Sequence, residues 1–488
     1  MFKGGFMGKY SVPAEILAQK PKGTMVKAIN GHYYVYEYSS FCSENGKRKT
    51  KTGKCIGSIK PEIGFVPNDN FNCDDEITTL EYGDYALVLA NSQKVLQLLK
   101  ECFNPADAVR IYCISMIHFI QGFVCLRDIK KYYEMSWLSI QYPGLKLGYD
   151  ALSEVYENLG RRQIRVLDFE QKLLDNSSGE VAIDGHAIAS QSDENDLAEK
   201  GYKFGHLNEK QMNLMMAYDI QTEKPLFARL YEGGLNDSVA IQDFFRQANF
   251  QGLLLIVDKG FYSYKNIELF SENNNSYLIP VPSRMDICKE ANLESCEMER
   301  FTYEKNRKAT VIEYSVKDYG AYRVYAFRDM NEFVIQDGNY LRYLEQGKKG
   351  YTKESYEQYR KWFGVYVLQT NLNDRSPKEI FELYKKRWSI ETYFNYFKNK
   401  ADYNSLYMQD YYKVQGLSFI MLVTSLIQHE LAVRAKEIGK KSINECLLDA
   451  RMVKINKRNG KWIAANCRSS VTKMFNDFNT ELQPQVYT

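Results

Sequence analysis

The chain has 488 residues, of which 44% are apolar and 26% are charged, a composition typical of soluble globular proteins. It excludes wholesale disorder, collagen and a pure coiled coil, and the length predicts roughly three domains. The net charge of only +3 does not by itself indicate a nucleic-acid-binding protein.

The charge is distributed unevenly along the chain. Residues 1–60 contain 11 Lys and Arg against 3 Asp and Glu, and residues 431–488 contain 11 against 5. The two ends therefore carry net charges of +8 and +6, and the segment between them carries −11. Basic ends indicate either a polyanionic partner or simply solvated termini, and charge alone leaves both alternatives open.

No feature of the sequence predicts export or a membrane span. The N-terminus lacks the apolar stretch of a secretory signal. The longest apolar segments, Ile111–Leu126 and Val414–Ile427, are too short or too interrupted for a membrane helix and predict buried core helices. The ten cysteines form no C-x-x-C pair, and the five histidines lack zinc-site spacing. We expect a cytoplasmic bacterial protein that acts at the nucleoid.

The N-terminal third predicts two different kinds of structure. Residues 31–60 contain the strand-like sequence HYYVYEY, a hairpin signal at Asn45-Gly46 and a basic stretch, which together predict a basic β-ribbon domain over residues 1–75. Residues 76–175 predict a helical domain. One of its helices starts at Asn104-Pro105, where Asn suits the N-cap and Pro the first turn.

From residue 176 the pattern becomes mixed α/β. Three strands, a helix, a strand, a helix and a strand are expected up to residue 283. Residues 284–362 are polar and Tyr-rich, with strand-like pieces near 310–316 and 321–328, and predict a β-rich insertion. The α/β pattern resumes over 363–437, including one long helix from Ser376-Pro377 to about Lys400. Residues 438–488 form a basic C-terminal region.

Two aspartates, Asp184 and Asp258, are expected directly after buried strands, each followed by Gly within two residues. A strand end is a rigid place from which to present a functional group at the edge of a sheet. An Asp after a strand is also ordinary turn chemistry, and for either residue alone that alternative stands. Turn chemistry explains the two aspartates together less readily than it explains either residue alone.

The long helix carries the third candidate acid, Glu391. At 100° per residue, Tyr384, Arg387, Glu391 and Lys398 fall within an arc of roughly 60°. The adjoining arc is apolar and consists of Leu383, Ile390, Phe394 and Phe397. The alternative is a solvated helix face with an ion pair between Arg387 and Glu391.

Asp184, Asp258 and Glu391 together form a set of hard oxygen ligands. Such a set can hold two divalent cations, Mg²⁺ or Mn²⁺ in preference to zinc, for phosphodiester chemistry. Arg387 and Lys398 beside Glu391 suit phosphate binding, and Tyr384 can bond to a phosphate or stack on a base.

The spacing Tyr-(2)-Arg-(3)-Glu-(6)-Lys at residues 384–398 resembles the signature of DDE transposases of insertion-sequence family four. The segments VDKGFYS around Asp258 and IDGHAIAS around Asp184 resemble the family's second- and first-acid motifs. His186 stands where a small hydroxyl residue often follows the Asp-Gly, which leaves the role of His186 open. The resemblance covers about residues 180–435, with the insertion between.

The resemblance implies an RNase H-like catalytic core and two Mg²⁺ ions, with Mn²⁺ as a substitute. It also implies cut-and-paste transposition, with cleavage at the terminal inverted repeats of an element and strand transfer into target DNA. Relatives cut the second strand through a DNA hairpin, and an aromatic residue of the insertion stabilises a flipped base. Trp362 is the candidate for that role, with core packing as its alternative. A homodimer in the complex with double-stranded DNA is also implied.

The basic N-terminal ribbon is then expected to bind the terminal repeats. Four of its cations are the candidate phosphate contacts: Lys47, Arg48, Lys49 and Lys51. Two alternatives to a transposase remain at this point, namely an RNase H-like nuclease that cleaves without joining, and a non-catalytic DNA-binding protein derived from a transposase.

Overall fold

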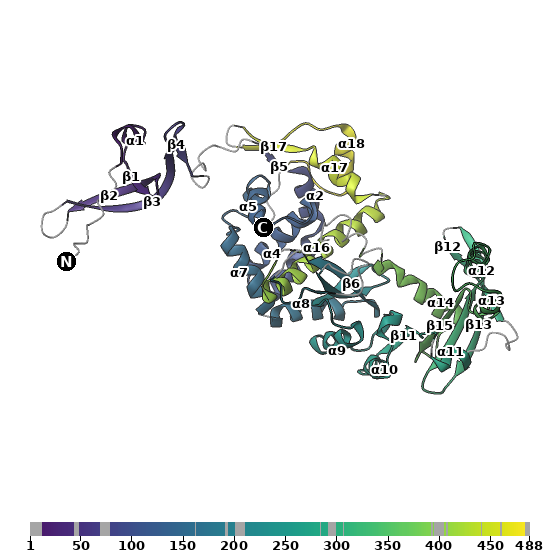
Figure 1. Cartoon of the computed structure of the whole chain (residues 1–488). Helices are drawn as coiled ribbons and strands as arrows, with labels where there is room; N and C mark the ends of the chain where they lie inside the picture. Colours follow the sequence, from purple (N-terminus) through teal and green to yellow (C-terminus); the bar gives the residue numbers. More distant parts are fainter. Residues whose placement is uncertain are drawn as a thin grey trace, which may run out of the picture. The chain divides into compact units, whose positions relative to one another are not determined.

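The chain forms two compact units, Met1–Thr78 and Thr79–Thr488 (Figure 1). The computed structural model describes residues 12–42, 48–68, 79–161, 163–190, 194–200, 210–283, 285–290, 299–305, 307–391, 394, 405–406, 408–440, 442–458 and 461–483.

The first unit is a small antiparallel sheet in the order β1-β2-β3-β4. Its elements are α1 (Ala14–Ala18), β1 (Thr24–Ile29), β2 (His32–Cys42), β3 (Arg48–Lys60) and β4 (Gly64–Pro67). The core of this unit contains Ile16, Val35, Ile56 and Ile59. The long pair β2 and β3 is the ribbon expected from the sequence, whereas the expected turn at Asn45-Gly46 lies outside the described residues.

The second unit begins with β5 (Thr79–Glu81) and a helical region. Its helices are α2 (Gly83–Asn91), α3 (Gln93–Cys102), α4 (Pro105–Gln121), α5 (Leu126–Glu134), α6 (Leu138–Gln141), α7 (Tyr149–Arg161) and α8 (Gln163–Asp175). Helix α4 begins as expected, because Asn104 Oδ1 accepts a hydrogen bond from the backbone N–H of Asp107 at 2.9 Å and Pro105 takes the first position.

A mixed sheet organises the rest of the second unit. In the described part of the chain it has eleven strands in the order β12-β13-β14-β15-β11-β10-β6-β8-β7, with β9 paired to β8 and β16 to β6. The strands before the insertion are β6 (Glu180–Ser190), β7 (Glu199–Lys200), β8 (Lys210–Asp219), β9 (Lys224–Glu232), β10 (Leu254–Val257) and β11 (Ser276–Pro280). Strand β10 is parallel to β6 and to β11, and β8 is antiparallel to β6.

Helices flank this sheet. In Figure 1, α9 (Asp237–Gln247) and α10 (Tyr264–Ser271) lie below β6, and α16 (Tyr411–Glu437) lies above it. Between β10 and α10 lies the short 3₁₀ helix η1 (Lys259–Phe261). The mixed α/β class expected from the sequence is therefore observed.

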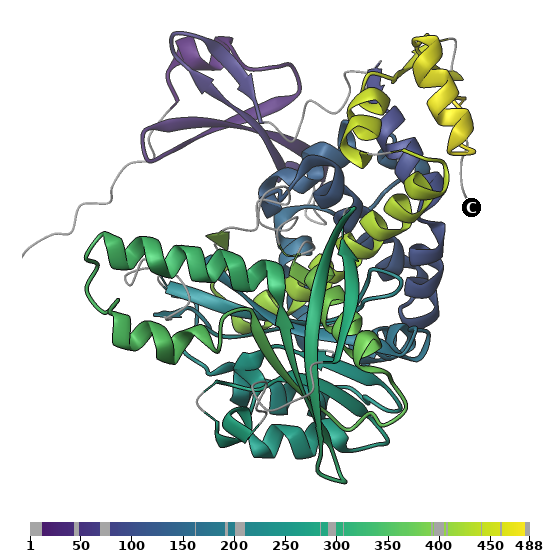
Figure 2. The ribbon, with the colours of Figure 1, turned by 90° about the vertical axis from the view of Figure 1, so that its right-hand side faces the viewer.

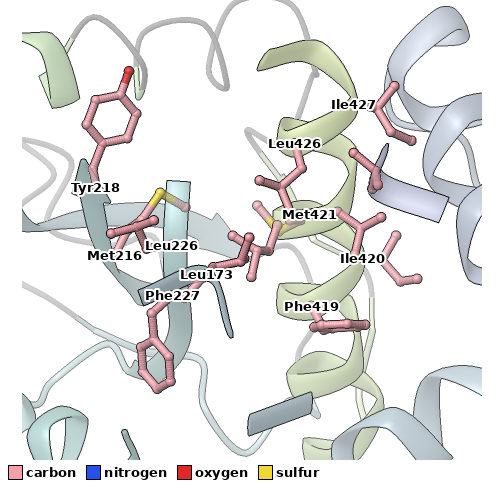
Figure 3. Close-up of a cluster of buried hydrophobic side chains, with 14 of the residues drawn as sticks. Leu173, Met216, Tyr218, Leu226, Phe227, Phe419, Ile420, Met421, Leu426 and Ile427 are labelled. Carbon is pink, nitrogen blue, oxygen red and sulfur yellow. The ribbon is translucent and has the colours of Figure 1, made fainter. Parts of the chain in front are cut away.

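Helix α16 is the central helix of the second unit. Figure 3 shows Met421 and Leu426 on the side of α16 that faces the sheet, and Ile420 and Ile427 on the opposite side. By length and mean hydropathy α16 is the one single helix among the described residues that could cross a membrane, yet 72% of its apolar window is buried within the protein. The buried core helix expected around the apolar stretch 414–427 is thus present.

The expected insertion contains strands that belong to the core sheet. Its strands β12 (Glu299–Lys305), β13 (Lys308–Asp318) and β14 (Arg323–Asp329) extend the core sheet, because β14 pairs with β15 (Val365–Thr370) along its length. Besides the short α11 (Asp286–Glu290), the insertion contains two longer helices, α12 (Met330–Glu345) and α13 (Lys353–Arg360), drawn in green in Figure 2.

The basic C-terminal region folds against the start of the second unit. Its elements are α17 (Ile443–Arg451), β17 (Lys454–Arg458), β18 (Lys461–Ala464) and α18 (Ser469–Asp477). Strand β17 pairs with β5, Arg451 Nε lies 3.0 Å from Asp84, and Lys454 Nζ lies 3.1 Å from Glu81. Two cations of the expected basic tail are therefore engaged in ion pairs within the fold.

Candidate active site

The two aspartates lie at the point where β6 and β10 part. The last register pair of these parallel strands is Ile183 with Val257, so Asp184 and Asp258 occupy the next position of each strand. Asp258 follows its strand, as expected. Asp184 does not: it lies in the middle of β6, which continues to Ser190 because β8 pairs with it over its whole length. The expected strand end at Asp184 was therefore wrong, although the sheet position serves the same purpose.

The helix that carries Glu391 is interrupted. Helix α14 (Pro377–Lys386) starts with a capping box between Ser376 and Glu379, as the Ser-Pro signal predicts. It ends in a turn at Arg387, and helical structure resumes at 388–391. The backbone N–H of Arg387 bonds the carbonyl of Tyr384 at 3.2 Å, a tightened i to i−3 turn. The prediction of one continuous helix to about Lys400 was wrong at this turn, and residues 395–400 lie outside the described residues.

The guanidinium of Arg387 lies between all three acids. Its Nη1 is 2.9 Å from Asp184 Oδ2, while its Nη2 is 3.0 Å from Glu391 Oε1 and 3.4 Å from Asp258 Oδ1. Only 6% of the Arg387 side chain is exposed, compared with 17% for Asp184, 42% for Asp258 and 37% for Glu391. Carboxylates from two strands and a helix thus meet at one cation.

Burial and charge both act on this cluster. Burial raises the pKa of Asp184 to about 6, with smaller contributions from the neighbouring charges of Asp258 and Glu391. Arg387 and the backbone N–H of Gly185, which donates to Asp184 Oδ1 at 2.8 Å, act in the opposite direction. Burial also raises the pKa of Tyr384, whose ring centre lies 5.8 Å from the guanidinium carbon, so this phenol stays neutral at physiological pH.

The donor set fits a hard divalent cation chemically. All three side chains offer carboxylate oxygens, which Mg²⁺ and Mn²⁺ prefer, and a single guanidinium leaves the three acids with a net charge of −2 when all are ionised. Within the described residues, however, no group of three or more His, Cys, Asp or Glu side chains is close enough to hold a metal ion. The acids face the guanidinium rather than a shared empty point.

The apolar face predicted for the Glu391 helix packs as expected. Leu383, Ile390 and Phe394 are buried, whereas Phe397 lies outside the described residues. The His186 ring stacks on Phe394, with ring centres 5.1 Å apart and planes 23° apart. His186 therefore supports the helix that carries Glu391, a packing role that the sequence left open.

The remaining candidates are spread through the chain. Lys398 and Lys47 lie outside the described residues. Arg48, Lys49 and Lys51 are exposed on β3 of the first unit. Trp362 is partly buried and packs against a small apolar cluster formed by Val281, Cys288, Val324, Ala326 and Val367. That position agrees with the core-packing alternative for Trp362 and does not test base stacking.

The sequence pattern indicated a phosphate contact for Arg387 but not its place among the acids. The available signal was the i to i+4 spacing of Arg387 and Glu391, which predicts an ion pair. That pair is present, but the contacts of Arg387 with Asp184 and Asp258 depend on the sheet and the helix coming together. Such contacts across about 200 and 130 residues of chain have no local signature.

Comparison with known proteins places these residues in one matched segment. The family model described as transposase DDE domain matches residues 176–427, which include all three acids and Arg387. A solved piggyBac transposase synaptic complex with hairpin DNA resembles the chain at 9% identity and a TM-score of 0.40, over 76% of this chain and 80% of that one. This likeness is too weak to carry an argument. No curated protein matches the sequence.

Proposed function

Because the chain belongs to the family of transposase DDE domains, we propose that it is a DNA transposase of cut-and-paste type. It cleaves DNA at the terminal inverted repeats of an insertion sequence and joins the released 3′ ends to target DNA. The observation that carries this proposal is the arrangement of Asp184, Asp258 and Glu391 around one guanidinium, inside the segment that matches the family.

In this proposal the three acids hold the divalent cations. When bound, two Mg²⁺ ions supply Lewis-acid activation of a water or a 3′-hydroxyl and stabilise the leaving oxygen. Asp184 lies in β6 and Asp258 directly follows β10, which is parallel to β6 and adjacent to it. The sheet therefore fixes the distance between the two residues. Glu391 approaches from the helix, whose position depends on the buried Ile390 and Phe394.

In this proposal Tyr384, Arg387 and Lys398 bind the DNA. Arg387 offers a planar fork of donors that matches a phosphate, and Lys398 a point charge. Tyr384 stays neutral and can donate a hydrogen bond to a phosphate oxygen. Arg48, Lys49 and Lys51 on β3, together with Lys47, which precedes them in the sequence, bind the phosphates of the terminal repeats, because exposed cations release counter-ions from DNA.

The finer assignments form part of the same proposal. The strand arrangement, with β8 and β10 on either side of β6 and β11 beyond β10, supports an RNase H-like core. Membership of insertion-sequence family four rests on the spacing of Tyr384, Arg387, Glu391 and Lys398. The second strand is cut through a hairpin, Trp362 stacks on a flipped base, and two copies of the chain bring the two ends together at the bacterial nucleoid.

Strand transfer by the purified full chain tests the proposal. The substrate is a duplex that carries the end of the element, taken from the DNA beside the reading frame, with Mg²⁺ and a plasmid target. Asp258→Asn and Glu391→Gln should each reduce joined product by at least about a thousandfold while DNA binding persists. Glu382→Gln, which changes a partly buried acid of α14 that is not one of the three acids around Arg387, serves as the matched control.

Three outcomes would replace the proposal. Full activity of Asp258→Asn or Glu391→Gln would remove these acids from the chemistry. Cleavage without joined product at every Mg²⁺ concentration would identify a nuclease. Metal-independent DNA binding without cleavage of any DNA substrate would identify a non-catalytic DNA-binding protein.

A further inference from the structure

The guanidinium of Arg387 does not use all of its hydrogen-bond donors. Its Nη1 and Nη2 contact the acids, but its buried Nε has no hydrogen-bond partner among the described residues. A buried donor without a partner lowers stability relative to a fully bonded one. The contact with Asp258 at 3.4 Å is an ion pair longer than a charge-assisted hydrogen bond. Two charge-assisted hydrogen bonds, to Asp184 and Glu391, and one longer ion pair, to Asp258, therefore hold the guanidinium.

A metal ion bound through the same carboxylate oxygens would lie close to the Arg387 guanidinium. The guanidinium contacts Asp184 Oδ2, Asp258 Oδ1 and Glu391 Oε1, one oxygen of each candidate ligand. A divalent cation bound by these acids would replace some of those contacts and repel the guanidinium at short range. Metal and guanidinium therefore compete for one position.

The location of Arg387 allows its side chain to leave without unfolding a helix. The residue occupies the turn between α14 and the helical segment 388–391, where α14 has ended. Its long side chain can rotate about its own bonds while the backbone and the buried Ile390 stay in place. The Tyr384 ring, 5.8 Å from the guanidinium carbon, flanks the cluster on the same turn of chain.

We propose that Arg387 takes the place of the metal ion in the metal-free protein. Its guanidinium holds the three acids together and dissociates from them when a metal ion binds. Once released, the guanidinium is the free, bidentate donor that a DNA phosphate requires. Metal loading and phosphate binding at this site then favour each other, because the two sites are linked by one side chain. This inference rests on the proposed function, since it takes the three acids as the metal ligands.

Labelling of arginine with phenylglyoxal, mapped by peptide mass spectrometry, tests the exchange in the unmodified full chain. Arg387 should be protected without metal, and its labelling should rise several-fold on addition of Mg²⁺. Arg229 is the internal control, because it is 4% exposed and forms a complete ion pair elsewhere in the second unit. Asp258→Asn should abolish the metal-dependent rise. Unchanged labelling of Arg387 at saturating Mg²⁺ would overturn the inference.

Binding of Mn²⁺, followed by electron paramagnetic resonance, supplies a second readout that does not depend on activity. Arg387→Gln removes the competing charge and should tighten Mn²⁺ binding on the order of tenfold, whereas Arg387→Lys should bind like the wild type. Equal Mn²⁺ affinity of wild type and Arg387→Gln, including no binding by either, would overturn the exchange. Strand transfer in Mg²⁺ would still stand as a separate test of the proposed function.

Discussion

Two buried arginines of the second unit meet carboxylates in opposite ways. Arg229 forms a one-to-one pair with Glu170, with Nη1 and Nη2 at 2.7 and 2.6 Å from its two oxygens, and Nε donates to Gln247 at 2.6 Å. Arg387 instead faces three acids, and its Nε has no partner among the described residues. Both guanidinium groups are almost fully buried, so the difference lies in charge balance rather than in burial.

The two arrangements have different physical consequences. A buried pair with matched charges and complete hydrogen bonds is stable only as a pair, since removal of one partner leaves an uncompensated charge in a low-dielectric interior. A cluster with a net charge of −2 attracts further positive charge, and it tolerates loss of one acid because that loss reduces repulsion. Glu170 with Arg229 therefore fits a structural role, and the Arg387 cluster fits the functional role that we propose for it.

The largest effect on stability is expected at Glu170. Glu170→Gln leaves the Arg229 charge buried without its counter-ion and should lower the free energy of unfolding by about 3–5 kcal/mol. Urea unfolding followed by circular dichroism measures this change. Glu101→Gln is the control, because Glu101 pairs with Lys172 at the exposed surface and should change stability by less than about 1 kcal/mol. Equal effects of the two variants would contradict the structural role of the buried pair.

A buried histidine that is neutral in the folded protein should lower the free energy of unfolding only at acidic pH. Burial lowers the pKa of His118 to about 4, while Tyr156 and the backbone N–H of Val124 bond its ring nitrogens. The unfolded chain, with an ordinary His pKa near 6.5, binds the proton first, so stability is fully present above pH 6.5 and falls as the pH drops towards 4. This residue should account for about 3 kcal/mol of that loss.

Unfolding free energies measured between pH 7 and pH 4 check this contribution. His118→Gln should flatten the curve, whereas a His32→Gln variant at the exposed start of β2 should keep the wild-type slope. An unchanged slope in His118→Gln would show that this imidazole accepts a proton inside the fold.

The smallest effect is expected at Asp258. In metal-free protein, Asp258→Asn should change the free energy of unfolding by less than about 1 kcal/mol, because the side chain is 42% exposed and Asp184 and Glu391 still balance Arg387. Thermal unfolding in a chelator measures this difference. A loss as large as that of Glu170→Gln would show that the acids around Arg387 are structural, and the contrast between the two arginines would disappear.

Local patterns in the sequence predicted much of the secondary structure and singled out the three candidate acids. Short apolar runs predicted β8, β9, β10 and β11, because a strand covered on both faces needs apolar side chains throughout, and helical sequence predicted α10. Capping residues predicted the starts of α4 and α14. The spacing of Tyr384, Arg387 and Glu391 indicated which side of the helix lies near the two aspartates.

The packing between distant elements, by contrast, sets how these elements meet. Asp184 lies within β6 rather than after it because β8 extends the pairing, and the insertion joins the core sheet because β14 pairs with β15. The turn at Arg387 and the contacts of its guanidinium with three acids depend on elements far apart in the chain. Short-range patterns contain no information on such contacts, since burial and charge balance arise only when the sheet and the helix pack together.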